Sequence, residues 1–198
     1  MNYIIKPAAT LFFTAVIVIA AVSYAYNITL EPIERQARRT RETAMMAVLP
    51  QASDFRLKQS REPSGSIVAV YEGFANGSFA DGNFADGALV GFVVELSPVG
   101  YGGNIDLMVG ISARDEKITG VRILRHNETP GLGALAAREG FYRRFDNKPL
   151  VPLTVVRSSP GEYEIAAITA STITTRAVTN AVNEAIEWYK SALEGGGR

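Results

Sequence analysis

The chain has 198 residues, with 20 basic and 20 acidic side chains, one histidine and no cysteine. Without cysteine it has no disulfide, no thiolate-bound zinc or iron–sulfur cluster and no thiol nucleophile, and one histidine leaves no multi-His metal site or bis-His haem. A net charge of zero argues against nucleic acid as a partner, so redox work by this chain needs an organic cofactor.

The N-terminal residues contain an apolar segment long enough to span a bilayer. Pro7 to Leu30 contains no charged side chain, and Ala8 to Tyr26 is dominated by aliphatic residues and phenylalanine. A helix of that length crosses a hydrocarbon core of about 30 Å. We therefore predict a transmembrane anchor over residues 1–30. A cleaved signal peptide is the alternative, and the length of the apolar run disfavours it.

Charge alone leaves the orientation of this anchor open. Lys6 lies on one side of it, and four arginines between Arg35 and Arg41 lie on the other. Counted naively, the positive-inside rule puts the following domain in the cytoplasm. The arginines are interleaved with glutamates, however, and long domains escape the control of flanking charges.

Residues 31–60 are predicted to form a membrane-proximal helix and linker, because helix formers run from Glu31 to Val48 before Leu49-Pro50. Residues 61–198 are predicted to form one domain. Strands are expected over Ser66–Tyr71, Ala88–Leu96, Leu107–Ile111, Ile118–Leu124, Leu150–Arg157 and Tyr163–Ile168, and helices over Ala134–Phe145 and Ile173–Leu193. Strands and helices follow no βαβ rhythm, which favours an α+β fold.

Between the first two predicted strands, the sequence Phe-Ala-Asp-Gly occurs at Phe79 and again at Phe84. Asn-Gly and Asp-Gly pairs are typical of tight turns, so this segment predicts a hairpin. No functional repeat is predicted, because two copies of four residues cannot build a repeat architecture.

Glycine gathers in two segments that follow predicted strands, Gly100 to Gly103 and His126 to Gly133. Glycine- and proline-rich backbone at a strand end can approach a flat ligand or a phosphate closely. The alternative is a pair of ordinary turns. His126 has no second histidine and no triad beside it, so it is interpreted as a turn or surface residue.

Hydroxyl side chains open the last predicted helix, with five in the seven residues Thr169 to Thr175. Serine and threonine cap helices, but one cap needs one hydroxyl. The N–H groups and the positive end of the helix dipole favour a phosphate, which a threonine hydroxyl can hydrogen-bond or carry as an ester.

Together these segments resemble the FMN-binding domain of the G subunit of the Rnf electron-transport complex, a domain that is also found in the C subunit of the sodium-pumping NADH:quinone reductase. The resemblance rests on Tyr101-Gly102-Gly103, on Glu128 to Gly133 as ETPGLG, and on Thr169 to Val178 as TASTITTRAV. It extends in the same order over nearly the whole chain.

In that family, FMN is joined by a phosphodiester bond to a threonine within a pattern close to D-x-x-[S/T]-G-A-T. The resemblance implies Thr172 as the linked residue. Ala166, Ala170 and Ser171 replace the Asp, Gly and Ala of the pattern. The implied cofactor-binding residues are Tyr101, Gly102, Glu128, Thr129, Gly131, Leu132, Gly133, Thr169, Ala170, Ser171, Thr172, Ile173 and Thr174.

Within this set, the resemblance implies that the flavin ring lies against the ETPGLG loop. Leu132 would offer apolar contact, and Glu128 and Thr129 polar contact to the ring or to the loop backbone. No G-x-G-x-x-G follows a strand, so no nicotinamide site is expected.

The implied function is an electron relay inside a ferredoxin:NAD+ oxidoreductase coupled to Na+ or H+ movement. Its expected partners are the other membrane and iron–sulfur subunits, a flavin transferase and the lipid bilayer. The resemblance also implies a single pass through the plasma membrane with the domain on the outer, periplasmic side. A membrane-tethered binding or assembly module and a solitary flavin reductase are the alternatives.

Overall fold

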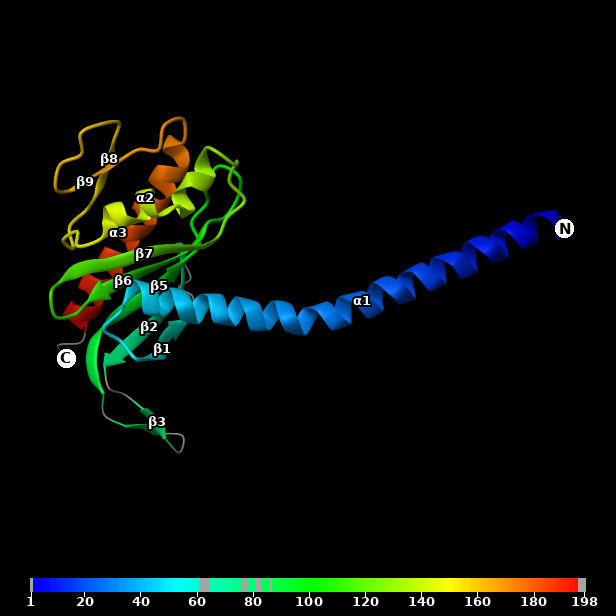
Figure 1. The fold of residues 1–198 in the computed structure, drawn as a ribbon, viewed down its shortest axis with the longest axis horizontal. Coiled ribbons are helices and arrows are strands. Elements are labelled where there is room, and N and C mark those ends of the chain that lie inside the picture. Colours follow the sequence, from blue (N-terminus) through cyan, green and yellow to red (C-terminus); the bar gives the residue numbers. More distant parts are fainter. Residues whose placement is uncertain (1, 61–64, 76–77, 81–82, 86, 196–198) are drawn as a thin grey trace. The chain divides into compact units, whose positions relative to one another are not determined.

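The computed structural model describes residues 2–60, 65–75, 78–80, 83–85 and 87–195. The chain divides into two compact units, Met1–Arg41 and Glu42–Arg198 (Figure 1). Helix α1 (Asn2–Val48) begins in the first unit and ends in the second, with Pro32 inside it. Residues that we predicted as two separate helices are therefore one.

The first unit is helical, and its segment Lys6–Tyr24 is long and apolar enough to cross a membrane. The hydroxyls of Thr10 and Thr14 donate to the backbone carbonyls of Lys6 and Leu11, so these polar groups are satisfied within the helix, as a lipid environment requires.

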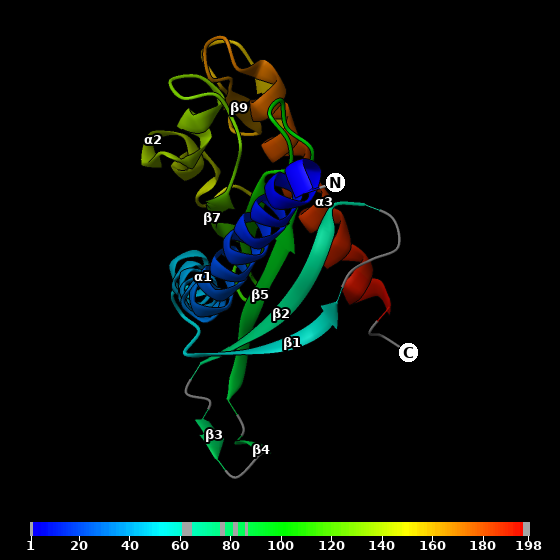
Figure 2. The same cartoon turned by 90° about the vertical axis from the view of Figure 1, so that its right-hand side faces the viewer.

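The second unit is built on a five-stranded antiparallel sheet with the order β1-β2-β5-β6-β7 (Figure 2). These strands are β1 (Asp54–Ser60), β2 (Ile67–Ala75), β5 (Ala88–Leu96), β6 (Asp106–Ser112) and β7 (Lys117–Arg125). Between β2 and β5 in the chain, β3 (Ser78–Ala80) pairs antiparallel with β4 (Asn83–Ala85). This is the predicted hairpin, although Asp81, Gly82 and Asp86 of its turn pairs lie outside the described residues.

Short elements and one long helix complete the second unit. They are the 3-10 turn η1 (Gly133–Ala137), α2 (Glu139–Tyr142), the 3-10 turn η2 (Arg143–Phe145), the parallel pair β8 (Thr154–Val156) and β9 (Glu164–Ala166), and α3 (Thr172–Gly195). The predicted α+β fold is confirmed. The helix expected over Ala134–Phe145 is instead three short turns, and the strand expected over Leu150–Arg157 shrinks to β8.

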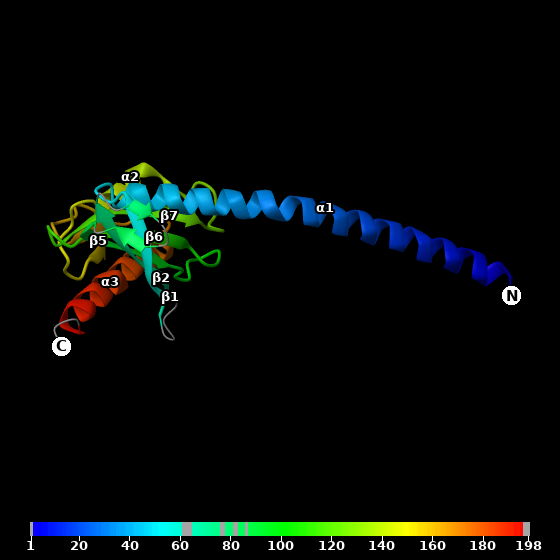
Figure 3. The same ribbon diagram turned by 90° about the horizontal axis from the view of Figure 1, so that it is seen from below.

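The sheet buries a hydrophobic core on each face, because neighbouring residues of a strand point to opposite sides. Val94 belongs to the larger core, together with Val182 and Ile186 of α3, and α3 lies against one face of the sheet (Figure 3). Val93 points the other way and packs in a second core with Leu49, just after the end of α1.

Strand β1 was not predicted, because it lies within residues 31–60, which we assigned to a helix and linker. Its sequence, DFRLKQS, is mostly polar, and it forms one edge of the sheet. Charged side chains are common on edge strands because they discourage pairing with other chains. Lys58 on this strand also forms an ion pair across to β2, with its ammonium 2.8 Å from the Glu72 carboxylate.

Candidate functional site

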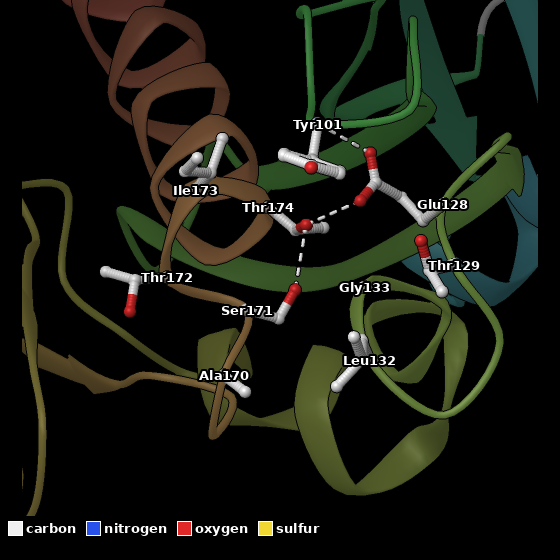
Figure 4. A pocket seen from close by; sticks show the side chains of 10 residues that line it. All are labelled: Tyr101, Glu128, Thr129, Leu132, Gly133, Ala170, Ser171, Thr172, Ile173 and Thr174. Atoms are coloured by element: carbon white, nitrogen blue, oxygen red, sulfur yellow. Dashed lines mark hydrogen bonds between the residues drawn. The ribbon is translucent and has the colours of Figure 1, made fainter.

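Three loops enclose a pocket of about 450 Å³ in the second unit (Figure 4). One is the turn Gly100–Gly103 between β5 and β6, one is the segment between β7 and η1, and one leads into α3. The lining residues are Tyr101, Glu128, Thr129, Leu132, Gly133, Ala170, Ser171, Thr172, Ile173 and Thr174. This volume lies within the ordinary range of small-molecule sites.

Sheet pairing explains why the first two loops meet. β6 and β7 are antiparallel, with Asp106 at the start of β6 opposite Arg125 at the end of β7. The turn that precedes β6 and the segment that follows β7 therefore leave the sheet at the same end. The first turn is closed by a hydrogen bond from the Gly100 N–H to the Gly103 carbonyl, 2.8 Å long.

Glu128 joins all three loops through its carboxylate, and the residue is only 6% exposed. Its Oε1 accepts from the backbone N–H groups of Tyr101 (2.8 Å) and Gly102 (3.0 Å). Its Oε2 accepts from the Thr174 hydroxyl at 2.6 Å, and that hydroxyl accepts in turn from Ser171 at 2.9 Å. Figure 4 shows the bonds that run from Tyr101 through Glu128 and Thr174 to Ser171.

Burial on its own would raise the pKa of Glu128, because it disfavours the charged form. The hydrogen bonds from Thr174, Gly102 and Tyr101 stabilise the carboxylate and outweigh burial, so the pKa lies below its ordinary value. Glu128 is therefore an anion at neutral pH.

The backbone that leads into α3 makes a sharp turn at Ala170, where φ is +60°. The turn is fastened by Thr175, which is fully buried. The Thr175 hydroxyl accepts from the Ile168 N–H (3.0 Å) and donates to the Ser171 carbonyl (2.9 Å). The sequence suggested only a surplus of hydroxyls, and the structure shows that this one shapes the helix start.

The five hydroxyls therefore fall into two classes. Those of Ser171, Thr174 and Thr175 are buried and hydrogen-bonded within the protein. Thr169 and Thr172 are exposed, and in the part of the chain that the structure describes their hydroxyls have no hydrogen-bond partner. Of these two, only Thr172 lines the pocket.

Helix α3 also presents backbone donors at this point. Its first backbone hydrogen bond runs from the Thr175 N–H to the Ser171 carbonyl, 3.1 Å long. The preceding N–H groups, those of Thr172, Ile173 and Thr174, have no partner within the helix. They give the pocket an anion-binding character.

Of the thirteen site residues that we predicted, ten line the pocket. The others are Gly102, whose N–H contacts Glu128, and Thr169 and Gly131, which are exposed beside the lining. Two contributors were missed, Thr175 and Gly100. A Cβ on Gly100 would collide with Glu128 Oε1. His126 accepts from the Glu128 N–H at 3.3 Å, which agrees with its interpretation as a turn residue.

Comparison with known proteins identifies the family. The sequence model of the FMN-binding domain matches residues 100–187, a range that includes all thirteen predicted site residues. The G subunit of the Na+-translocating ferredoxin:NAD+ oxidoreductase complex of Acetobacterium woodii is 33% identical, over 95% of this chain and 92% of that protein. The G subunit of an ion-translocating oxidoreductase complex of Methanosarcina acetivorans is 31% identical, over 96% and 98%.

The chain belongs to the G-subunit family of ion-translocating oxidoreductase complexes.

A crystal structure supports the fold of this G subunit. The C subunit of the Na+-translocating NADH-quinone reductase of Parabacteroides distasonis superposes with a TM-score of 0.55 at 17% identity, covering 78% of this chain and 92% of that one. At that identity the likeness concerns the fold alone. Among the described residues, no group of three or more His, Asp or Glu side chains is placed to hold a metal ion.

Proposed function

We propose that this G subunit holds FMN, bonded to Thr172, and relays electrons within an ion-translocating ferredoxin:NAD+ oxidoreductase complex. The observation that carries the proposal is that the pocket unites the residues expected from the sequence around one free hydroxyl at a helix start. Family membership supports the complex, and the FMN-binding domain match supports the cofactor.

Thr172 is the proposed attachment site because its hydroxyl is accessible. A phosphodiester bond needs a hydroxyl that a transferase can reach and that is not engaged elsewhere. Ser171, Thr174 and Thr175 fail this condition because they are buried and hydrogen-bonded. Thr172 meets it, and the N-terminus of α3 stabilises the negative charge that a phosphodiester keeps.

The rest of the pocket suits a flat aromatic group. Leu132 and Ile173 are 41% and 55% exposed, which leaves apolar surface for contact with a ring. Thr129 adds a polar side chain on the ETPGLG loop. Bound FMN supplies the electron transfer, and the protein supplies attachment, orientation and electrostatic environment.

The anchor segment Lys6–Tyr24 supports a membrane location for this function. We propose a single-pass arrangement in the plasma membrane with the second unit on the periplasmic side, where the flavin transferase acts. Other membrane and iron–sulfur subunits of the complex would be its redox partners. Small side chains of the anchor, such as Ala15, Ala20 and Ser23, are suited to close packing against neighbouring helices.

Mass spectrometry of the full chain from membranes of its native host tests the covalent bond. We expect denatured protein to keep the mass of one FMN and the Thr172 peptide to carry it. Thr172→Ala should abolish the attached flavin and still fold, with one cooperative melting transition, because this exposed side chain itself has little effect on stability.

The matched control is Thr169→Ala, which removes the other exposed hydroxyl of the same loop. The flavin that this variant carries should still be attached to the Thr172 peptide. Covalent flavin that persists in the Thr172 variant would show that another residue is the attachment site. Wild-type protein without covalent flavin, in a host that contains the transferase, would reject the covalent part of the proposal.

A further inference from the structure

We propose that Glu128 is a positioning residue, which locks the three pocket loops together and places a fixed negative charge beside the flavin that lowers its reduction potential. This inference rests on the proposed function, because it assumes FMN in this pocket. It assigns Glu128 to the protein scaffold, whereas the family resemblance left open a contact with the ring.

The locking role follows from how the hydrogen bonds are distributed. The two oxygens of Glu128 accept from the turn at Tyr101 and Gly102 and from Thr174 on α3, while the residue itself belongs to the ETPGLG loop. Thr174 and Glu128 are 46 residues apart in sequence. Among the described residues that line the pocket, no other side chain hydrogen-bonds to two loops besides its own.

Glycine makes the enclosure of the carboxylate possible. A Cβ on Gly100 would collide with Oε1, and a Cβ on Gly133 would collide with Oε2. Glycine therefore fits tightly on both sides of the carboxylate, where no larger residue would. Three of the hydrogen bonds that the Glu128 carboxylate can accept are therefore already made within the protein.

The electrostatic role follows from the same contacts. The hydrogen bonds from Thr174, Gly102 and Tyr101 keep the carboxylate ionised, so the charge is a permanent feature of the pocket wall. Adding an electron to a flavin near a fixed negative charge is less favourable than adding it near a neutral group, and low polarity around the charge strengthens this effect.

Two substitutions separate the two roles. Glu128→Gln keeps the shape and one oxygen that can accept from Tyr101 and Gly102. Its NH2 group can donate to the Thr174 hydroxyl, which then donates to Ser171 in place of accepting from it, so the three loops stay linked and the charge is removed. Glu128→Ala removes the lock as well, because the Tyr101 and Gly102 N–H groups and the Thr174 hydroxyl all lose their acceptor. Glu139→Gln, which removes an exposed carboxylate on α2, is the control for charge removal in general.

The measurements use the full chain, purified in detergent from the native host. Covalent FMN per chain is determined by intact mass, and the midpoint potential by redox titration of the flavin absorbance. Glu128→Gln should retain most of the FMN and show a higher midpoint potential than wild type and Glu139→Gln. Glu128→Ala should lose at least half of the FMN.

A third readout needs no flavin. Because the pKa of Glu128 is lowered on folding, its contribution to stability is present above its unfolded pKa and is lost as pH falls through the folded pKa. The melting temperature of wild type should therefore fall more steeply below about pH 4.5, near the unfolded value, than that of Glu128→Gln. Glu139→Gln should follow the wild-type curve.

Each measurement tests one of the two roles proposed for Glu128. A midpoint potential in Glu128→Gln equal to that of wild type would overturn the electrostatic role. Full flavin loading in Glu128→Ala, together with an unchanged acid limb of the melting curve in Glu128→Gln, would overturn the lock. Wild-type protein without flavin would reject the proposed function instead, and the melting curves would still decide the locking role.

Discussion

Ala170 has an unusual backbone at a position where the family pattern has glycine. Its φ of +60° lies in the left-handed region, which costs a residue with a Cβ roughly 1–2 kcal/mol. The turn is still formed, because the Thr175 hydroxyl bonds on both sides of it, to Ile168 and Ser171. The helix start therefore stores strain that glycine would relieve.

We expect Ala170→Gly to raise the free energy of unfolding by about 0.5–1 kcal/mol. The relief of left-handed strain is partly offset by the greater freedom of glycine in the unfolded chain. Denaturant unfolding of the two proteins measures the difference. If the strain limits recognition by the transferase, the covalent flavin content of this variant should rise as well.

Gly131 provides the matched control on the facing loop. Its φ is +79°, and a Cβ there would meet no atom within 4 Å, so Gly131→Ala tests backbone strain without a steric clash. It should lower the free energy of unfolding by about 1 kcal/mol. Changes of the same sign in the two variants would contradict this account of Ala170.

At the level of elements, the sequence predicted what depends on local pattern. The apolar stripe and the hydroxyls of α3 predicted a helix from Ile173 to Leu193, and the structure has α3 over Thr172–Gly195. Strands β5, β6 and β7 were found within one residue of the predicted bounds at each end. Strand β1 escaped prediction because its seven residues are mostly polar, and its pairing with β2 defines it instead.

The site shows the same division between local and long-range information. The resemblance to the FMN-binding domain, which rests on the glycine and hydroxyl motifs, implied the residues that line the pocket. The motifs did not predict that Thr175 fastens the turn or that both Glu128 oxygens bond within the protein. Those facts depend on contacts between segments up to 46 residues apart. Local patterns in a single sequence do not reveal such contacts.

The end of α1 is an element whose importance the sequence concealed. Val48 and Leu49 are fully buried, although we had placed them at the end of a membrane-proximal helix and in the linker that follows it. The Thr119 hydroxyl of β7 donates to the Val48 carbonyl, and a Cβ on Gly110 of β6 would collide with that carbonyl. The backbone at the end of α1 therefore packs closely against β6 and β7.

We expect Leu49→Ala to lower the free energy of unfolding by about 2–4 kcal/mol, because it leaves a cavity in the second core. Met46→Ala is the control, since Met46 lies three residues earlier and is 52% exposed. That change should cost less than about 0.5 kcal/mol. Equal effects in the two variants, measured by urea unfolding, would mean that the second core adds little stability.

For the whole molecule, the division at Arg41 and Glu42 predicts where the flavin domain can be separated from its anchor. The exposed apolar side chains of the anchor segment lie in the first unit. The second unit holds both cores, including Met45, Val48 and Leu49 from the last turn of α1 and the residue after it.

A chain of residues 42–198 should therefore be soluble without detergent and melt in one cooperative transition. A chain of residues 54–198 keeps every strand of the sheet but loses that part of the second core, exposing Val93 and Met108. It should aggregate or melt at least about 10 °C lower, because the loss of several buried side chains costs several kcal/mol. Comparison of the two by calorimetry tests the boundary. If the shorter chain were equally stable, the domain would begin at β1, and residues 42–53 would only connect it to the membrane anchor.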